Sequence, residues 1–303
     1  MKRVPDLLRL LLLSALALRG WASDPFSSDR WAYLDNGQVR LGINMSAGGC
    51  IGYMSLSGCI SNVLNHHDRG RFVQQSYYGM EDGTFWAKQK WRWNPVQGGD
   101  YRHNPARILE EKTTRTTGYT RSMARHWSGC VDLPEVTFEQ WITLTGKVAH
   151  VKFRMTYTGT NDHPTTGHEI PAVFLNPEYK NLFVYNGAEP WSNRPPHKSV
   201  PGWPNESRKI TEHWAAYLDD SGLGLAAYVP ASSNLTCYIF GNGNASQGAC
   251  SYFAPLINFP VKRGTRFEYD LWLLLGTLDE MRDTIYQIER QRTAPGARNR
   301  ATR

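Results

Sequence analysis

The stretch that decides the fold runs from residue 136 to residue 159 and is VTFEQWITLTGKVAHVKFRMTYTG. Apolar and polar residues alternate through VTFEQWITL and again through VKFRMTY, which is the period of a β-strand with one buried face. The residues Thr145-Gly146-Lys147 lie between the two runs and suit a turn. We therefore predict two long antiparallel strands joined as a hairpin.

Runs of the same kind recur along the chain, and Gly, Pro, Asn or Asp fills the gaps between them. Besides the hairpin, the predicted strands span residues 38–45, 71–78, 172–176, 182–187, 214–220, 222–230, 236–241 and 266–276. Strands do not alternate with helical patterns, which argues against a parallel sheet. The sequence thus predicts an all-β fold, a large antiparallel β-sandwich formed by residues 23–290 as a single domain.

One short helix is predicted at the end of this domain. Thr277-Leu278-Asp279-Glu280 resembles a helix N-terminal cap, and apolar residues then recur at near-helical spacing to about Arg290. Residues 291–303 have no apolar pattern, so we expect them to form a disordered basic tail.

The first 22 residues have the layout of a signal peptide. Lys2, Arg3 and Arg9 form a positive region, residues 10–18 are an apolar run, and Gly20 and Ala22 suit a cleavage site. A membrane anchor is the alternative, but the apolar run is shorter than the roughly 18–20 residues that a span needs. We therefore expect a secreted, extracellular protein without a membrane span.

Export would allow N-glycans and disulfides. N-glycosylation sequons occur at Asn44, Asn205, Asn234 and Asn244, so we expect a glycoprotein. Asn205 and Asn244 are the better candidates because turn residues surround them. Among the five cysteines, Cys237 and Cys250 flank a Gly- and Asn-rich turn and are a plausible disulfide. Cys50 and Cys59 form a second local candidate pair, which leaves Cys130 over.

The net charge of +7 is concentrated at the two ends of the chain. Residues 1–22 carry a net +3 and the residues from Arg290 onward a net +5, so subtracting both from +7 leaves about −1 for the body. The basic composition therefore does not indicate nucleic acid as a partner, and the aromatic residues lack the interleaved basic surface that nucleic-acid binding requires.

The most polar and aromatic stretch is NHHDRGRFVQQSYYGMEDGTFWAKQKWRWNPVQGGDY (65–101), which has little aliphatic content. It suits a concave surface on which sugar rings stack against aromatic platforms while amides and charged groups bind hydroxyls. The alternative is a loop network in which Asp68 pairs with Arg71. The candidate catalytic residues here are Asp68, Arg71, Tyr77 and Asp100, and the candidate substrate-binding residues are His67, Gln74, Trp93, Asn94 and Gln97.

Strand geometry groups some of these candidates. If residues 71–78 form a strand, alternate residues share a face. Arg71, Gln75 and Tyr77 then point the same way, and a guanidinium, an amide and a phenol on one face suit hydroxyls or a carboxylate.

Two later segments add further candidates. His168 and Glu169 lie between a polar loop and an apolar strand, where Glu169 would serve as a general acid or base if burial raises its pKa. A structural glutamate is the alternative. Glu189 and Trp191 lie in a long Pro-, Gly- and Trp-rich loop that suits the rim of a cleft. The histidine and carboxylate spacings fit no known metal pattern, so we expect no metal and no cofactor.

Two segments carry a family resemblance. LDNGQVRLGINMSAGGCIGYMSLSGCISNVLNHHDRGRFVQQSYY (34–78) resembles the N-terminal strands of the galactose-mutarotase-like supersandwich group, which includes aldose epimerases and the β-sandwich domains of several polysaccharide lyases and glycoside hydrolases. FEYDLWLLLGTLDEMRDTIYQIE (267–289) is similar to the closing strand and helix of secreted carbohydrate-active β-domains. The resemblance implies the fold and a carbohydrate ligand. No histidine and glutamate of this sequence match the spacing of the catalytic His and Glu of the epimerases. We therefore assign no epimerase catalytic role to any residue of this sequence.

These observations favour a secreted enzyme that cleaves a polysaccharide, and they leave two reactions open. In a lyase, Arg71, Gln74 or Asn94 would neutralise a uronate carboxylate, and Tyr77 or His168 would move the proton. In a hydrolase, two of the carboxylates Asp68, Asp100, Glu169 and Glu189 would flank the glycosidic bond. The alternatives are a non-catalytic extracellular carbohydrate-binding protein and a purely structural domain.

Overall fold

The computed structural model describes residues 28–294. The predicted signal peptide and most of the predicted tail lie outside the described residues. Within them the chain is built almost wholly of antiparallel strands, with one α-helix, which confirms the predicted all-β class. No helix in this part of the chain is long and apolar enough to cross a membrane.

Most of the strands follow one another with short connections, but longer segments follow β3, β7 and β13. They are β1 (Trp31–Asp35), β2 (Val39–Asn44), β3 (Cys50–Leu56), β4 (Val73–Ser76), β5 (Glu81–Trp86), β6 (Gln89–Arg92), β7 (Pro95–Val96), β8 (Ile108–Thr113), β9 (Thr117–His126), β10 (Asp132–Thr145), β11 (Val148–Tyr157), β12 (His163–Leu175), β13 (Asn181–Val184), β14 (His197–Ser199), β15 (Glu206–Lys209), β16 (Trp214–Leu218), β17 (Leu223–Tyr228), β18 (Asn234–Phe240), β19 (Cys250–Val261) and β20 (Arg266–Thr277). A short 3₁₀ helix, Ala245–Gln247, precedes β19, and α1 (Leu278–Thr293) follows β20.

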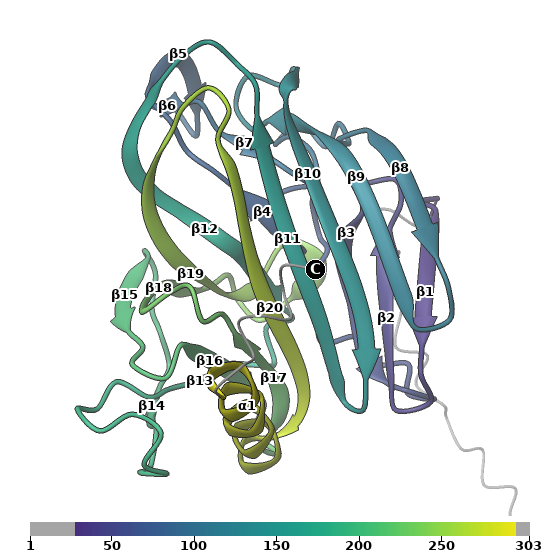
Figure 1. Cartoon of the computed structure of the whole chain (residues 1–303), viewed down its shortest axis with the longest axis vertical. Helices are drawn as coiled ribbons and strands as arrows, with labels where there is room; N and C mark the ends of the chain where they lie inside the picture. Colours follow the sequence, from purple (N-terminus) through teal and green to yellow (C-terminus); the bar gives the residue numbers. More distant parts are fainter. Residues whose placement is uncertain (1–27, 295–303) are drawn as a thin grey trace, which may run out of the picture.

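Two antiparallel ladders form the layers of the sandwich (Figure 1). One runs β1–β2–β3–β4–β12–β19–β18–β15. The other runs β8–β9–β10–β11–β20–β17–β16–β13–β14. Strand β7 pairs with both β4 and β9 and so joins the two ladders. Strands β5 and β6 form a separate hairpin that projects beyond the layers (Figure 1).

The predicted hairpin is confirmed as β10 and β11. Thr145 pairs with Val148 across the two-residue turn, and Gly146 adopts a φ of +58°. Along β11 every second side chain is buried, and β10 alternates in the same way over most of its length. The period of two in the sequence therefore places one face of each strand in the core between the layers, where Phe138 of β10 stacks on Tyr77 at 5.8 Å.

The predicted helix is also confirmed. Thr277 accepts a hydrogen bond from the Glu280 backbone N–H, and the Glu280 side chain bonds back to the Thr277 N–H, which completes a capping box. Helix α1 continues to Thr293, so residues 291–293 of the predicted disordered tail are helical. Several strands of the structure were not predicted from the sequence, among them β8, β9 and β19.

Neither predicted disulfide is formed, because all five cysteines are free thiols. In the β18–β19 register Cys237 lies opposite Phe253, and Cys250 lies opposite Phe240, so the two thiols are not partners. Cys50 and Cys59 are separated by the full length of β3, whose extended backbone carries their Cα atoms beyond disulfide reach.

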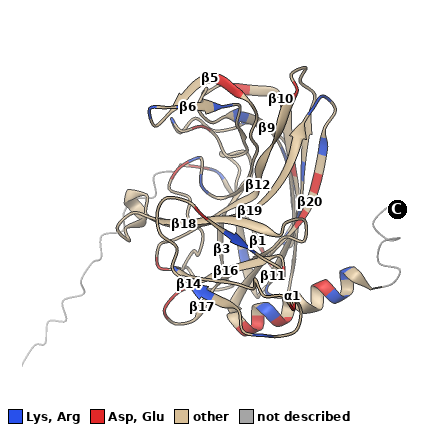
Figure 2. Cartoon of the chain, turned by 90° about the vertical axis from the view of Figure 1, so that its left-hand side faces the viewer, with Lys and Arg blue, Asp and Glu red and all other residues tan. Residues whose placement is uncertain are grey.

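Basic and acidic residues are interspersed along the chain in Figure 2, including in α1 and β20. This agrees with the small net charge of the body of the chain. Any electrostatic preference for a ligand must therefore come from a local site.

Candidate functional site

A pocket of about 330 Å³ lies where the chain after β3, the β5–β6 hairpin, β12 and the β18–β19 pair meet. We call it the aromatic pocket. Its lining residues are Asp68, Gly70, Arg71, Ser76, Tyr78, Trp86, Trp91, Asn94, Val96, Trp127, Glu169, Phe174, Trp203, Asn205, Tyr238, Phe240 and Tyr252.

Strand register builds the floor of this pocket. Glu169 of β12 pairs with Ser76 of β4, and Phe174 of β12 pairs with Tyr252 of β19. Tyr252 in turn pairs with Tyr238 of β18, and the two rings stack at 4.4 Å. The floor thus combines residues from four strands that are far apart in the sequence.

Aromatic side chains form two walls. On one side Trp86 of the β5–β6 hairpin packs edge-on against Trp91 and Trp127, with ring centroids 5.0 and 5.8 Å apart. On the other side Trp203 packs edge-on against Tyr238 and Phe240, at 4.9 and 5.1 Å. Trp203 is 58% exposed. Exposed aromatic faces beside polar groups are suited to stacking against sugar rings.

Glu169 is the titratable group at the floor of the pocket. Its carboxyl accepts a hydrogen bond of 2.7 Å from the Tyr252 hydroxyl and is also hydrogen-bonded by the Tyr78 side chain. Burial raises the pKa of Glu169, and the two tyrosine hydrogen bonds offset part of that rise. The carboxyl is therefore held toward its neutral form, which can donate a proton to a bound ligand.

Arg71 and Asp68 form an ion pair in the same pocket. The Arg71 Nε donates to Asp68 Oδ2 at 3.2 Å, while Asp68 Oδ1 accepts from the Gly70 backbone N–H at 2.8 Å. The Arg71 guanidinium also lies over the Phe174 ring at 5.7 Å. The pocket therefore holds one ion-paired carboxylate and one carboxyl with a raised pKa.

The predicted strand over residues 71–78 starts two residues later than expected, at Val73. Phe72 adopts a φ of +89°, which interrupts the alternation of the strand. Arg71 therefore lies in the pocket with Ser76 and Tyr78, not on the face of Tyr77. The grouping of Arg71, Gln75 and Tyr77 on one face was wrong for this reason.

Tyr77 and His168 are core residues and do not line the pocket. Tyr77 is fully buried between Phe138 and the His168 ring. His168 accepts a hydrogen bond from the Tyr78 backbone N–H through Nδ1 and donates from Nε2 to the Phe259 carbonyl. Burial lowers the pKa of His168 to about 4, so its ring is neutral and serves as a brace between β4 and β19.

Asp100 is buried in a loop network outside the pocket. Its carboxylate accepts from the backbone N–H groups of Arg102 and Asn104 and pairs with Arg125. Gln74 and Gln97 are likewise buried and bonded to backbone: Gln74 Oε1 accepts from the Gly98 N–H at 2.7 Å, and Gln97 Oε1 accepts from the Gln75 N–H at 3.2 Å. These three residues hold loops in place.

The remaining predicted binding residues lie in other surroundings. Trp93 is buried and stacks on His163 at 3.9 Å. Glu189 is exposed and pairs with Arg194, and Trp191 packs against Tyr286 beside a separate cavity of about 420 Å³. His67 does not line the pocket, and burial and the nearby Arg71 lower its pKa.

Of the predicted site residues the pocket thus brings together Asp68, Arg71, Asn94 and Glu169. Asn94 also anchors the hairpin, because its Oδ1 accepts from Trp91 Nε1 and its Nδ2 donates to the Tyr77 carbonyl. Tyr78, Tyr252 and Trp203 line the pocket but were not among the predicted catalytic or substrate-binding residues. The Pro- and Gly-rich sequence around Trp203 could have indicated a loop at the rim of a site. The tyrosines could not have been singled out, because aromatic residues are common in strands.

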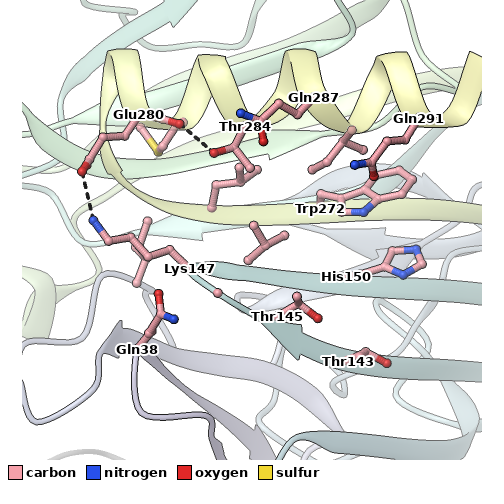
Figure 3. Close-up of a pocket in the computed structure, with 16 residues that line it drawn as sticks. Gln38, Thr143, Thr145, Lys147, His150, Trp272, Glu280, Thr284, Gln287 and Gln291 are labelled. Atoms are coloured by element: carbon pink, nitrogen blue, oxygen red, sulfur yellow. Dashed lines mark hydrogen bonds and ion pairs between the residues drawn. The ribbon is translucent and has the colours of Figure 1, made fainter.

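A larger cavity of about 720 Å³ lies between α1 and strands β10, β11 and β20 (Figure 3). None of the predicted site residues line it. Its ionisable side chains already have partners, since Lys147 bonds Glu280 at 3.0 Å and His150 bonds Asp270 at 2.8 Å. No group of three or more His, Cys, Asp and Glu within residues 28–294 is placed to hold a metal ion. The aromatic pocket is therefore the stronger candidate site.

Comparison with known proteins identifies structures that share this fold. No protein-family model and no curated protein matches the sequence. A galactose mutarotase-like protein from Lactobacillus casei superposes with a TM-score of 0.57 at 11% identity, covering 82% of this chain and 100% of that one. A putative aldose 1-epimerase from Escherichia coli K12 gives 0.53 at 10% identity, covering 82% and 99%.

A GH36 alpha-galactosidase from Geobacillus stearothermophilus superposes with a TM-score of 0.54 at 9% identity, covering 88% of this chain and 44% of that one. At such low identity the likeness concerns the fold and not the chemistry. Together with the two ladders described above, it establishes that this chain has the galactose-mutarotase-like fold.

Proposed function

We propose that the protein binds a carbohydrate in the aromatic pocket and hydrolyses a glycosidic bond there. The observation that carries the proposal is Glu169, a carboxyl with a raised pKa that shares an aromatic-walled pocket with the ion-paired carboxylate of Asp68. Glycoside hydrolysis uses two carboxyl groups, one as a general acid with a raised pKa and the other as a base or nucleophile. Solved proteins of the same fold include one named as a putative aldose 1-epimerase and one as an alpha-galactosidase, which supports a sugar ligand.

In the proposed reaction neutral Glu169 donates its proton to the glycosidic oxygen as the bond from that oxygen to the anomeric carbon breaks. The leaving chain departs as an alcohol. Water adds to the anomeric carbon, and Asp68 accepts the proton that this water releases. Asp68 then releases this proton to solvent, and solvent returns a proton to Glu169. The Trp86 and Trp203 walls hold the sugar rings over the two carboxyl groups.

Hydrolysis is favoured over β-elimination because the residues proposed to abstract the proton in a lyase do not lie in the pocket. The lyase reading relied on Tyr77 or His168, and neither lines the pocket. The tyrosines that do line it include Tyr78 and Tyr252, and burial raises the pKa of both well above the ordinary value. A phenol with a raised pKa is a poor proton acceptor near neutral pH.

Non-catalytic carbohydrate binding is the second candidate. It is favoured by the state of Asp68, whose two carboxylate oxygens are already bonded to the Gly70 N–H and to Arg71. A carboxylate held in this way can serve to orient Arg71 and take no part in chemistry.

We also propose that the protein is exported, on the strength of the N-terminal sequence alone. Of the four sequons, Asn205, Asn234 and Asn244 are exposed, whereas Asn44 is fully buried and donates a hydrogen bond to Asp29. Glycosylation is therefore expected at the exposed Asn234 and Asn244 and not at the buried Asn44, whereas a glycan on Asn205 would occupy the aromatic pocket that this residue lines.

The function is tested by incubating the protein with a panel of neutral and acidic polysaccharides. We expect new reducing ends without the ultraviolet absorbance of unsaturated ends, and a loss of at least about 100-fold in Glu169→Gln and Asp68→Asn. Glu178→Gln is the matched control, because Glu178 also has a raised pKa but lies outside the pocket.

Products with unsaturated ends alone would refute hydrolysis. Binding without products, unchanged in Glu169→Gln, would establish the second candidate. A protein that neither binds nor cleaves any member of the panel would contradict the sugar site itself.

A further inference from the structure

The Arg71 guanidinium has hydrogen-bonding capacity that the described protein does not use. Its Nε donates to Asp68, but Nη1 is buried and has no hydrogen-bond partner among residues 28–294. The side chain keeps 12% of its surface exposed and lines the aromatic pocket. A buried N–H group without a partner is unfavourable, so a ligand oxygen that reaches it would be favoured.

The surroundings hold this guanidinium in place. Asp68 binds it from one edge and the Phe174 ring lies beneath it. On a further side Gly248, with a φ of +83°, approaches so closely that a Cβ there would lie 3.3 Å from Nη2. Arg71 is therefore preorganised. Its Nε is bonded to Asp68, and the terminal nitrogens Nη1 and Nη2 remain for a ligand.

The charged residues that line the pocket are few, and they leave Arg71 as the group that an anion would meet. Arg71 is the one Lys or Arg among the lining residues, and Asp68 already compensates its charge. Glu169 is the other acidic lining residue, and burial favours its neutral form. A ligand carboxylate would thus meet the Arg71 cation, the carboxylate of Asp68 that is paired with it, and a carboxyl whose raised pKa reduces its repulsion of an anion.

We propose that the aromatic pocket takes an acidic glycan, and that Arg71 binds the carboxylate of a uronate residue and determines this preference. The inference rests on the proposed sugar site and goes beyond it by naming the substrate class. A planar guanidinium presents parallel N–H donors that match the two oxygens of a carboxylate. A neutral sugar has a hydroxymethyl group in that position, and its single oxygen cannot accept both hydrogen bonds in this way.

The test compares each acidic ligand with its own neutral form. Oligomers of galacturonate, glucuronate and mannuronate, and the methyl ester of each, are titrated into the full-length protein by calorimetry. Esterification removes the charge and keeps the sugar ring. We expect the preferred acid to bind at least about 10-fold more tightly than its ester, which corresponds to about 1.4 kcal/mol, with a preference that weakens as salt is added.

Two variants and one control connect the preference to Arg71. Arg71→Lys keeps the charge without the fork and should lose most of the discrimination. The double variant Arg71→Gln/Asp68→Asn removes both members of the ion pair, so no unpaired charge is left buried, and it should bind acid and ester alike. Arg263→Gln removes the same charge from an exposed position in the turn before β20 and should behave as the wild type.

The outcomes separate this inference from the proposed function. Equal binding of acid and ester, or a preference for neutral glycans, overturns the uronate assignment while the sugar site stands. A preference for acids that survives both Arg71 variants overturns the role of Arg71. Failure to bind any acid, ester or neutral glycan counts against the sugar site and the inference together.

Discussion

The hydroxyl of Tyr252 on β19 donates a hydrogen bond of 2.7 Å to the carboxyl of Glu169 on β12. The two strands are neighbours in one ladder, and the bond lies at the floor of the aromatic pocket. It connects the fold to the chemistry, because a donor at this position stabilises the ionised form of a carboxyl whose pKa is raised by burial.

The first prediction concerns the pH dependence of hydrolysis. Activity should fall as pH rises through the raised pKa of Glu169, because the general acid then loses its proton. Tyr252→Phe removes a hydrogen bond that lowers this pKa, so the basic limb of kcat against pH should move to higher pH. Tyr269→Phe is the control, since its buried hydroxyl has no partner among the described residues. If the basic limb of the Tyr252→Phe profile stays at the same pH or moves to lower pH, Glu169 is not the titrating acid.

The second prediction concerns stability. The folded-state pKa of Glu169 lies above its ordinary value of 4.5, so folding favours the protonated form. The contribution of this group to stability is complete below the unfolded pKa and is lost as pH rises through the folded pKa. Glu169→Gln should therefore raise the urea midpoint at about pH 8 more than at about pH 4. The same midpoint difference between variant and wild type at both pH values would contradict the raised pKa.

The third prediction concerns the aromatic walls. Trp203→Ala and Trp86→Ala should each weaken glycan binding about 5- to 10-fold, the loss expected for one stacking surface of about 1 kcal/mol. Phe85→Ala is the matched control, because Phe85 is as exposed as Trp203, at 58%, and does not line the pocket. If Phe85→Ala weakens binding as much as Trp86→Ala, the hairpin acts through its overall shape and not through the Trp86 ring.

The fourth prediction separates structure from catalysis at Asp100. Asp100→Asn leaves Arg125 without its buried partner, so unfolding should become easier by about 3 kcal/mol. Asp132→Asn removes the exposed partner of the same arginine and should cost less than about 1 kcal/mol. Turnover by folded Asp100→Asn should stay within about 2-fold of wild type. A loss of turnover without loss of stability would return Asp100 to the catalytic candidates.

The fifth prediction concerns the cysteines. Cys59 is exposed, whereas Cys50, Cys237 and Cys250 are buried, and burial raises the pKa of Cys237 and Cys250 to about 11. Iodoacetamide should therefore label Cys59 in the folded protein and the three buried thiols only after unfolding. Reductant should leave the Tm unchanged. A drop in Tm on reduction would reveal a disulfide.

Local patterns accounted for the elements that local physics controls. The β10–β11 hairpin follows from alternation and a two-residue turn, and the start of α1 follows from a capping box within four residues. The polar stretch 65–101 likewise directed attention to Asp68, Arg71 and Asn94, which do line the pocket. The short strands β7 and β14 carry too few residues for their alternation to be detected.

What the sequence by itself determined is the all-β class, the hairpin, the capped helix and the carboxyl groups from which a site can be made. What only the tertiary structure decided is which of those groups meet. Strand pairing brought Tyr252 to Glu169, 83 positions away in the chain, and the positive φ of Phe72 turned Arg71 toward the pocket and left Tyr77 in the core. The physical reason is that alternation within a strand is local, whereas the register between strands and a single backbone dihedral outside them depend on the packing of the whole sandwich.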